Sequence, residues 1–238
     1  MSSERPGTRG PLRIAIDGPS GSGKSSVSRA VARALGLGYL DTGAMYRAVT
    51  WWCLDEGVDL TDVDAVARAA REVPLVMGTD PADPSVTVGG RDIGTEIRSS
   101  EISSVVSVVA TNLDVRAELR RRQRDLMARV ANEAGGVVAE GRDITTVVAP
   151  DADVRILLTA SEEARLRRRS TELHGGASPE AIAATRDQVV RRDRDDSTVS
   201  TFHEAADGVV LLDTSDLDFD ESVQAVLDVV AASAPASP

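Results

Sequence analysis

The chain has 238 residues, of which 42% are hydrophobic and 27% are charged, and its net charge is −11. This hydrophobic fraction can fill a sizeable core and excludes wholesale disorder, while no stretch approaches the ~18 uncharged apolar residues of a membrane span. The acidic balance argues against a nucleic-acid or membrane-surface protein, but it allows small anionic ligands held by local arginines.

The cysteine and histidine content indicates a reducing environment. Cys53 is the single cysteine, so an internal disulfide is excluded, and two histidines, His174 and His203, are too few for a typical structural zinc site. Residues 1–11 contain no apolar run of the kind that a secretory signal needs. We therefore expect a cytoplasmic protein.

Short apolar runs and longer helical segments alternate along the chain. The runs predict strands at Leu12–Ile16, Tyr39–Leu40, Val137–Ala139, Val154–Leu158 and Val209–Leu212. Helices are predicted at Lys24–Leu35, Ala44–Glu56, Val105–Asn132, Glu162–Glu172, Pro179–Arg192 and Glu221–Ala231. This alternation predicts an α/β fold with an open, parallel, five-stranded sheet flanked by helices.

Two regions interrupt the alternation of strands and helices. Residues 73–98 are rich in Gly, Pro and Asp and contain a Val-Thr-Val run, which predicts a small antiparallel insertion. Residues 161–200 predict a charged helical hairpin, in which Ser178 and Pro179 mark the start of the second helix. We expect the ends of the chain, residues 1–11 and 232–238, to be disordered.

A phosphate-binding motif lies between the first strand and the first helix. It reads Gly18-Pro19-Ser20-Gly21-Ser22-Gly23-Lys24-Ser25 and is followed by Ser26. The glycines let successive backbone N–H groups point at phosphate oxygens, and the helix N-terminus adds its positive dipole end. Lys24, which is the only lysine beside 26 arginines, supplies a compact charge, and Ser25 can ligate Mg²⁺.

The motif predicts a nucleoside triphosphate ligand but does not define the reaction. A guanine-specific switch needs an Asn-Lys-x-Asp motif, which a chain with a single lysine at position 24 cannot supply. The Leu-Ser-Gly-Gly signature of transporter ATPases is also absent from the sequence. Small phosphotransferases are the main class that remains.

Polar clusters follow three of the predicted strands. They are Asp41–Arg47, Glu140–Asp143 and Asp213–Ser215. Because ligands bind at the carboxyl ends of the strands in open α/β sheets, these clusters are candidates for the acceptor site. Glu140 has the pattern of a carboxylate that supports a metal ion, although a buried structural acid would have the same pattern.

The motifs, taken together, resemble those of the bacterial cytidylate kinases. The matching segments are Gly18–Ser25, Asp41–Arg47, Glu96–Arg98, the arginine-rich segment from Arg116 to Arg124, Glu140–Asp143, Thr146–Val148 and Arg192–Thr198. They occur in order over nearly the whole chain. The resemblance implies a nucleoside monophosphate kinase that transfers phosphate from ATP, with Mg²⁺, to CMP or dCMP.

The resemblance also implies an arrangement of regions. A single domain would run from residue 12 to 238, with a monophosphate-binding region at 42–107 that includes the insert, and a helical lid at 161–200. The expected partners are the small substrates alone, without nucleic acid polymer or membrane, and we expect a monomer.

The resemblance assigns roles to residues by their position in the motifs. Lys24, Arg142 and Arg192 would act in catalysis, Ser25 and Glu140 would hold the metal, and Arg167 would lie near ATP. The acceptor would be bound by Thr42, Tyr46, Arg47, Arg98, Ser107, Arg116, Arg142, Asp143, Arg192 and Asp196. Among these, Arg47, Arg98 and Arg142 would hold its phosphate, and Ser107, Arg116 and Asp143 would read the cytosine.

The chain departs from the pattern of this family at three places. Thr145 stands where the family usually has Gly, Val199 stands where it usually has Arg, and residues 200–203 replace a stretch that usually contains Pro. Two alternative functions stay open at this point. One is a P-loop kinase for another nucleoside monophosphate or a small metabolite, and the other is a nucleotide-binding regulator without turnover.

Overall fold

The central sheet has five parallel strands, as the sequence predicts. The computed structural model describes residues 10–200 and 202–233, and for His174, Asp187, Gln188 and Arg192 it describes the backbone alone. The strands are β2 (Gly38–Asp41), β6 (Gly136–Gly141), β1 (Leu12–Asp17), β7 (Val154–Thr159) and β8 (Val210–Asp213), in this spatial order. The fold class is therefore confirmed.

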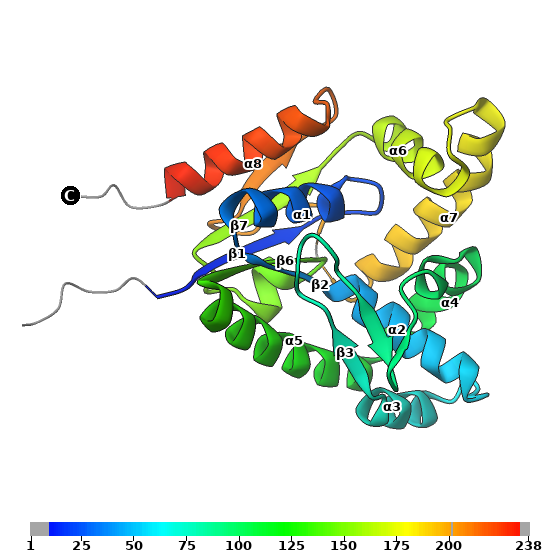
Figure 1. The fold of residues 1–238 in the computed structure, drawn as a ribbon. Coiled ribbons are helices and arrows are strands. Elements are labelled where there is room, and N and C mark those ends of the chain that lie inside the picture. The colour runs from blue at the N-terminus through cyan, green and yellow to red at the C-terminus, as the bar shows by residue number, and fades with distance from the viewer. Residues whose placement is uncertain (1–9, 201, 234–238) are drawn as a thin grey trace, which may run out of the picture.

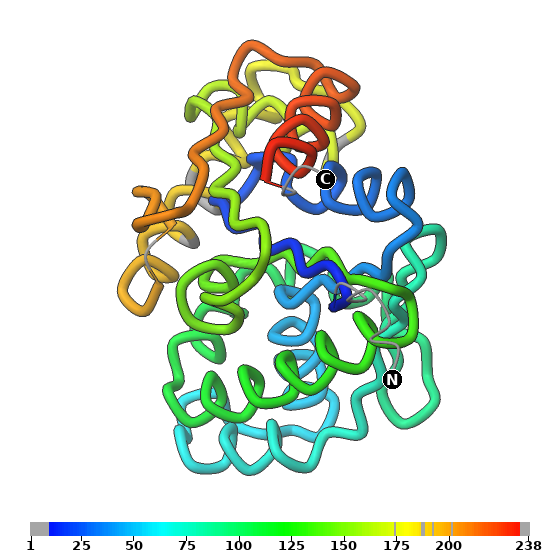
Figure 2. The backbone as a smooth tube through the Cα atoms, turned by 90° about the vertical axis from the view of Figure 1, so that its left-hand side faces the viewer, coloured from blue at the N-terminus to red at the C-terminus, as the bar shows by residue number. Residues whose placement is uncertain are grey.

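Helices cover both faces of the sheet (Figures 1 and 2). On one face lie α1 (Lys24–Leu35) and α8 (Phe219–Ser233), and on the other lie α2 (Thr42–Asp55) and α5 (Leu113–Ala134). Alternate residues of a strand belong to two separate cores, because successive side chains of a strand point to opposite faces of the sheet. Ile14 and Ile16 of β1 pack under α1 and α8, whereas Ala15 between them belongs to the larger core on the other face.

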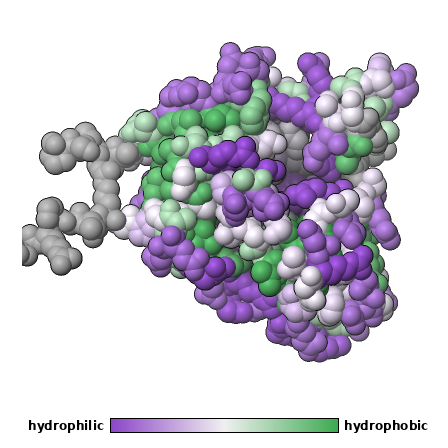
Figure 3. Space-filling view, viewed as in Figure 1, coloured by the Kyte–Doolittle hydropathy of each residue, from purple (hydrophilic) through white to green (hydrophobic). Residues whose placement is uncertain are grey.

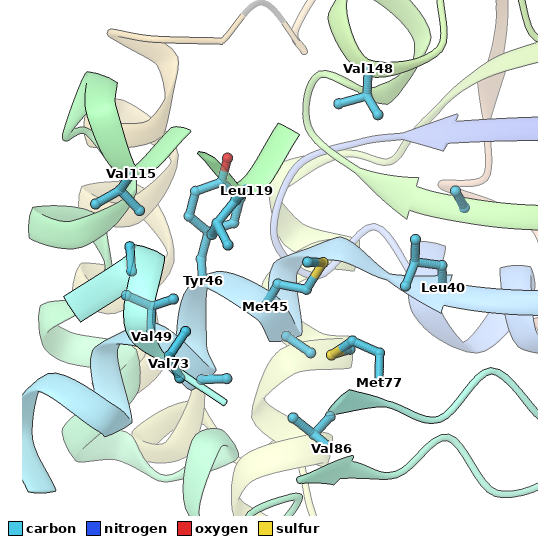
Figure 4. Packing of buried hydrophobic residues seen from close by; sticks show 14 of the residues in the cluster. Leu40, Met45, Tyr46, Val49, Val73, Met77, Val86, Val115, Leu119 and Val148 are labelled. Carbon is cyan, nitrogen blue, oxygen red and sulfur yellow. The ribbon is translucent and has the colours of Figure 1, made fainter. Parts of the chain in front are cut away.

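The larger core extends beyond the sheet into the helices of the acceptor side. Tyr46 of α2 and Leu119 of α5 belong to this core, as do Met77 and Val86 of the insertion (Figure 4). In Figure 3, hydrophobic side chains gather over α1 and α8, while the side around α6 and α7 is mostly hydrophilic. The helices α2 and α5 and the insertion are thus joined to the sheet by one continuous core.

The single helix expected over Val105–Asn132 is wrong. The structure has two helices here, α4 (Ser100–Ala110) and α5, separated at Thr111 and Asn112. The side chain of Asn112 accepts hydrogen bonds from the backbone N–H groups of Asp114 and Val115, at 3.0 and 3.2 Å, so it caps a new helix. The break lets α4 turn away and pack against α2 and α7.

The insertion is a small antiparallel sheet. Its strands are β3 (Leu75–Met77), β4 (Val86–Val88) and β5 (Arg91–Asp92), followed by a 3₁₀ turn η1 (Glu96–Arg98). It is preceded by α3 (Val63–Glu72), which the sequence analysis does not predict, although Asp62 caps it through the N–H of Ala65. A short π-helical turn, η2 (Ile144–Val148), follows β6.

The helical hairpin consists of α6 (Glu162–His174) and α7 (Pro179–Ser197). Ser178 caps α7 through the N–H of Ala181, with Pro179 in the first turn, as the sequence predicts. At the other end of the chain, α8 continues to Ser233, which is two residues into the segment expected to be disordered. Of the helices within residues 10–200 and 202–233, none combines the length and the hydropathy needed to cross a membrane.

Candidate functional site

A cavity of about 500 Å³ lies between the phosphate-binding loop, the acceptor-side helices and the helical hairpin. It brings together most of the side chains that the sequence singles out. Those that line it are Ser20, Gly21, Gly23, Lys24, Ser25, Ser26, Thr42, Tyr46, Arg47, Arg98, Arg116, Glu140, Arg142, Asp143 and Asp196. The segments that carry them span residues 20 to 196, so the fold assembles the site from most of the chain.

Other predicted residues lie outside the lining. Gly18, Pro19 and Ser22 form the back of the loop, and Ser107 lies on α4 with its Oγ 3.5 Å from Asp196 Oδ1. The guanidinium of Arg167 points away and pairs with Glu163 on the same helix, at 2.7 Å, with 59% of its side chain exposed. The side chain of Arg192 lies outside the described part of the structure.

The loop has the conformation that phosphate binding requires. Gly23 precedes α1 with a φ of 87°, a value that favours glycine, and a Cβ at Gly18 would lie 2.2 Å from the backbone oxygen of Leu158. The Nζ of Lys24 lies 3.4 Å from the carbonyl oxygen of Pro19. Both glycines are therefore needed for the close turn that leads into the helix.

A buried acidic pair lies beside the loop, at the ends of β2 and β6. Glu140 Oε1 accepts a hydrogen bond of 2.7 Å from Ser25 Oγ, and Tyr39 donates to the same oxygen at 3.4 Å. Burial and the neighbouring charge of Asp41 raise the pKa of Glu140 to about 7. Burial alone would also raise the pKa of Asp41, but Arg47 and the N–H of Ala44 hold that pKa below its ordinary value.

The hydroxyl of Ser25 and the carboxylate of Glu140 are suitable ligands for Mg²⁺. This ion prefers oxygen donors and is usually held by one or two carboxylates together with substrate phosphates. Within the described residues, no group of three or more His, Cys, Asp and Glu side chains could hold a metal by itself. A cation here would also stabilise the charged form of Glu140, whose pKa lies near neutrality. The donor set therefore fits a magnesium ion that depends on nucleotide phosphates.

Three arginines of the cavity have acidic or carbonyl partners at its acceptor end. Arg47 Nη2 binds Asp41 Oδ2 at 2.8 Å, and Arg98 Nη1 donates to the carbonyl of Gly94 at 2.7 Å. Arg142 is bound by two carboxylates of α7, those of Asp193 and Asp196, both at 2.9 Å. All three arginines line the same cavity, where their positive charge would stabilise an anionic ligand.

A buried charge cluster around Arg116 and Asp143 forms another part of the cavity wall. Arg116 Nη2 lies 2.6 Å from Asp143 Oδ2, and Arg120 donates to the same oxygen through Nη2 at 2.8 Å. Arg116 also donates to the carbonyl of Ala110 and to Ser200 Oγ, at 3.1 and 2.7 Å. The residues Arg116 and Asp143 are each 5% exposed, so both charges are taken out of water and held by each other.

Further polar atoms next to this cluster are buried without a hydrogen-bond partner among the described residues. They are the hydroxyl of Tyr46, Nε of Arg116 and both amide atoms of Gln123. Gln123 lies close enough to Tyr46 to influence the pKa of its hydroxyl, but the two groups miss hydrogen-bond geometry. Since buried polar groups are normally paired, this wall has unused capacity for a polar ligand or for water.

The hairpin closes over the loop through contacts that sequence reasoning missed. Asp193 Oδ1 accepts from the backbone N–H of Ser20 at 3.0 Å, and its other oxygen pairs with Arg165. Arg168 donates to the carbonyls of Ser22 and Thr214, at 3.1 and 2.6 Å. Although burial would raise the pKa of Asp193, Arg142 and the N–H of Ser20 hold it below its ordinary value. The sequence analysis places Arg167 near ATP, and no local signal in the arginine run at 165–169 distinguishes Arg165 and Arg168, which contact the loop, from Arg167, which faces solvent.

Comparisons with known proteins agree with the resemblance of the motifs. The family model described as cytidylate kinase matches residues 14–232. A cytidylate kinase of Streptomyces avermitilis is 48% identical over 218 residues, which are 91% of each chain. A cytidylate kinase of Rhodococcus opacus is 50% identical over 221 residues, which are 92% of this chain and 94% of the relative. Among solved structures, a gluconokinase from Sinorhizobium meliloti 1021 has a TM-score of 0.47 and 19% identity, with 94% of each chain covered.

Proposed function

The chain belongs to the cytidylate kinase family, and from this premise we propose that it transfers the γ-phosphoryl group of ATP to CMP and dCMP. The products are ADP and CDP or dCDP. The proposal includes Mg²⁺ as the metal and the cytoplasm as the place of reaction.

One observation carries this proposal beyond family membership. A single cavity is lined by the phosphate-binding loop, by the ion pair of Arg116 with Asp143, and by three further arginines, Arg47, Arg98 and Arg142. A monophosphate whose base lies against the pair would place its phosphate among these arginines. That phosphate would then face the γ-phosphoryl group held by the loop. The arrangement is that expected of a kinase with a nucleotide acceptor.

The transfer needs charge neutralisation more than acid–base chemistry. A monophosphate is mostly dianionic at neutral pH, so its oxygen is already a nucleophile and a general base is unnecessary. The difficulty is the approach of two polyanions in line. Lys24 would hold the γ-phosphoryl group, while Arg142 would stabilise the charge that spreads over its equatorial oxygens. Arg192 is proposed for the same task by its position in the family motif.

Ser25 and Glu140 would hold Mg²⁺ beside the phosphates of ATP. When bound, the metal supplies a positive charge that neutralises the phosphate oxygens. Ser26 and the loop from Gly18 to Gly23 would bind the remaining phosphate oxygens through their N–H groups. Arg165 and Arg168, which already contact the loop, are better placed for this task than Arg167, whose guanidinium faces solvent.

The hairpin would exclude water from the reaction. Its contacts with the loop run through Asp193 and Arg165, and they would close the site on the side of the triphosphate. Exclusion matters because water would otherwise compete with the acceptor for the phosphoryl group. Ser107 and Asp196, which approach each other between α4 and α7, would contact the base and the ribose from the hairpin side.

The proposal is tested by coupled measurement of ADP production over a panel of acceptors. The panel contains CMP, dCMP, UMP, AMP and GMP, together with shikimate and gluconate as hydroxyl acceptors. We expect kcat/KM to be highest for CMP and dCMP. Turnover of a hydroxyl acceptor alone, or nucleotide binding without turnover of any acceptor, would contradict the proposal.

A further inference from the structure

We propose that Phe202 is a positioning residue for Arg142, whose guanidinium it holds in the plane needed for phosphate contact. This inference rests on the proposed function, because it assigns a support to one of the groups proposed to act on the acceptor. Phe202 lies in the segment that follows α7, where the sequence analysis assigns no role to it.

The contact joins two distant parts of the chain. The Cζ of Arg142, which follows β6, lies 4.6 Å from the centroid of the Phe202 ring. The ring is 1% exposed, and the side chain of Arg142 is 13% exposed. A guanidinium over an aromatic face is attracted by the quadrupole of the ring, and the attraction is strongest where water is excluded.

Two carboxylates complete the support of the guanidinium. Asp193 binds Nη1 of Arg142 and Asp196 binds its Nε, so these two bonds fix the edges of the planar group. Neither bond uses Nη2. Bonds at Nη1 and Nε still allow the plane of the guanidinium to rotate about the line that joins these two atoms. The face contact with Phe202 removes this freedom, so Nη2 keeps one direction in the cavity.

The ring is itself anchored to the sheet. Phe202 packs with Leu157 of β7 and with Val209 in a small cluster that is separate from the two main cores. It also lies against the ring of His203, with centroids 4.4 Å apart. Because β7 belongs to the same sheet as β6, the ring has a fixed place relative to the strand that directly precedes Arg142. If Phe202 had only a structural role, the packing of this cluster would be sufficient, and the face of the aromatic ring would not matter.

The test separates the aromatic face from the packing. Phenylalanines carrying one, two and three fluorine atoms at position 202 keep the ring size but weaken its quadrupole in steps. We expect kcat/KM for CMP to fall in steps along this series, and the Phe202→Leu variant to lose roughly 5- to 30-fold. The KM for ATP should stay within about twofold of the wild-type value, because Arg142 is proposed to act on the acceptor phosphate and on the charge that develops during transfer, not on the binding of ATP.

Two controls keep the result interpretable. Val209→Ala removes packing from the same cluster but leaves the ring, so it should lower thermal stability while kcat/KM stays within about twofold. In an Arg142→Gln background the cation is gone, so the fluorine series should have no further effect. If kcat/KM does not change along the fluorine series in the enzyme that has Arg142, the inference is wrong. It is also wrong if kcat/KM falls as steeply along the series in the Arg142→Gln background as in the wild type.

The inference and the proposed function fail in different ways. If the wild-type enzyme phosphorylates CMP but the fluorine series is flat, this inference alone is wrong. If the wild-type enzyme turns over none of the monophosphates, the proposed function is wrong and the inference falls with it. If the wild type prefers another monophosphate, the series measured with that acceptor decides the role of Phe202.

Discussion

The hydroxyl of Thr145 donates a hydrogen bond of 2.6 Å to the carboxylate of Asp17. The same carboxylate accepts from the backbone N–H groups of Thr145 and Ile144, at 2.8 and 2.9 Å. Asp17 ends β1, directly before the phosphate-binding loop, and is 1% exposed. These bonds tie the turn that carries Asp143 to the base of the loop. Thr145 therefore has a contact that a glycine side chain could not make.

This contact predicts a stability loss that depends on pH. Burial raises the pKa of Asp17 to about 6, although the three hydrogen bonds oppose the shift by favouring the charged form. Thr145→Val removes one donor from that charged form. We expect the free energy of unfolding to fall by about 1–3 kcal/mol at pH 8, where Asp17 is ionised, and by less at pH 5. Urea unfolding at both pH values measures the difference.

In the wild-type protein, the raised pKa of Asp17 determines how the contribution of this group to stability changes with pH. Because the pKa of Asp17 is raised in the folded state from 3.8 to about 6, this group contributes stability that is complete below about pH 4 and is lost as the pH rises through 6. Thr145→Ser, which keeps the hydroxyl, is the matched control and should be closer to the wild type at both pH values. Equal losses for the Val variant at pH 5 and pH 8 would argue against an ionised Asp17.

We predict that position 24 requires a lysine and that arginine, which has the same charge, cannot replace it. The loop encloses a compact ammonium, and the larger planar guanidinium of Lys24→Arg would not fit the same place. We expect unchanged thermal stability and a decrease of kcat by at least ~100-fold, which is typical of the loss of one preorganised charge. Steady-state kinetics with CMP and ATP measure the effect. Turnover near that of the wild type would show that the loop does not act on the transferred phosphoryl group.

The helical hairpin is predicted to be protected by a bisubstrate analogue. Asp193, Arg142 and Arg165 form a charge network between α7, the turn after β6 and α6, and a polyphosphate would supply further negative charge to the same arginines. At saturating analogue, we expect trypsin to cleave residues 161–200 at least ~10-fold more slowly. Mass spectrometry of the fragments locates the cleavage. The exposed Arg121 on α5 is an internal reference that should be cleaved at an unchanged rate.

Local patterns in the sequence suffice for the sheet and for the phosphate-binding loop. The strand β6 is buried on both faces and contains the continuous apolar run Val137–Ala139. The loop is recognised by its motif, in which Gly23 and Lys24 lead into α1. The break at Asn112 was not predicted, because an arginine-rich segment with high helix propensity masks a single capping residue. The packing of α4 against α7 has more influence on where this helix boundary lies than the local sequence has.

The part of the cavity wall around Arg116 and Asp143 depends on long-range contacts that no local pattern encodes. The pairing of Arg116 with both Asp143 and Ser200 joins α5, the turn after β6 and the end of the hairpin. Resemblance to a family suggested the first pair, but Ser200 and Phe202 lie in the stretch where this chain departs from the family. Their contacts become visible only in three dimensions, and so does the solvent-facing direction of Arg167.

We propose that the Arg116–Asp143 pair distinguishes cytosine from uracil. Cytosine presents an amino donor at N4 and acceptors at N3 and O2, whereas uracil presents acceptor O4 and a donor at N3. Both guanidinium groups that bind Asp143 use its Oδ2, which leaves Oδ1 for the amino group of the base. Against uracil the carboxylate would face a carbonyl oxygen, with no proton between the two acceptors.

Asp143→Asn is therefore predicted to reverse part of this selectivity. An unpaired buried group costs about 1–3 kcal/mol, which corresponds to roughly a 5- to 150-fold preference. The Asn variant keeps the size of the side chain and adds an amide donor that can satisfy O4 of uracil. We expect it to lose most of its CMP activity, since Arg116 and Arg120 also lose their partner, while the ratio of kcat/KM for UMP to that for CMP rises. Asp151→Asn, the same change at an exposed carboxylate outside the cavity, should leave the ratio unaltered. If the ratio of the Asp143 variant equals that of the wild type, Asp143 supports the turn after β6 and does not read the base.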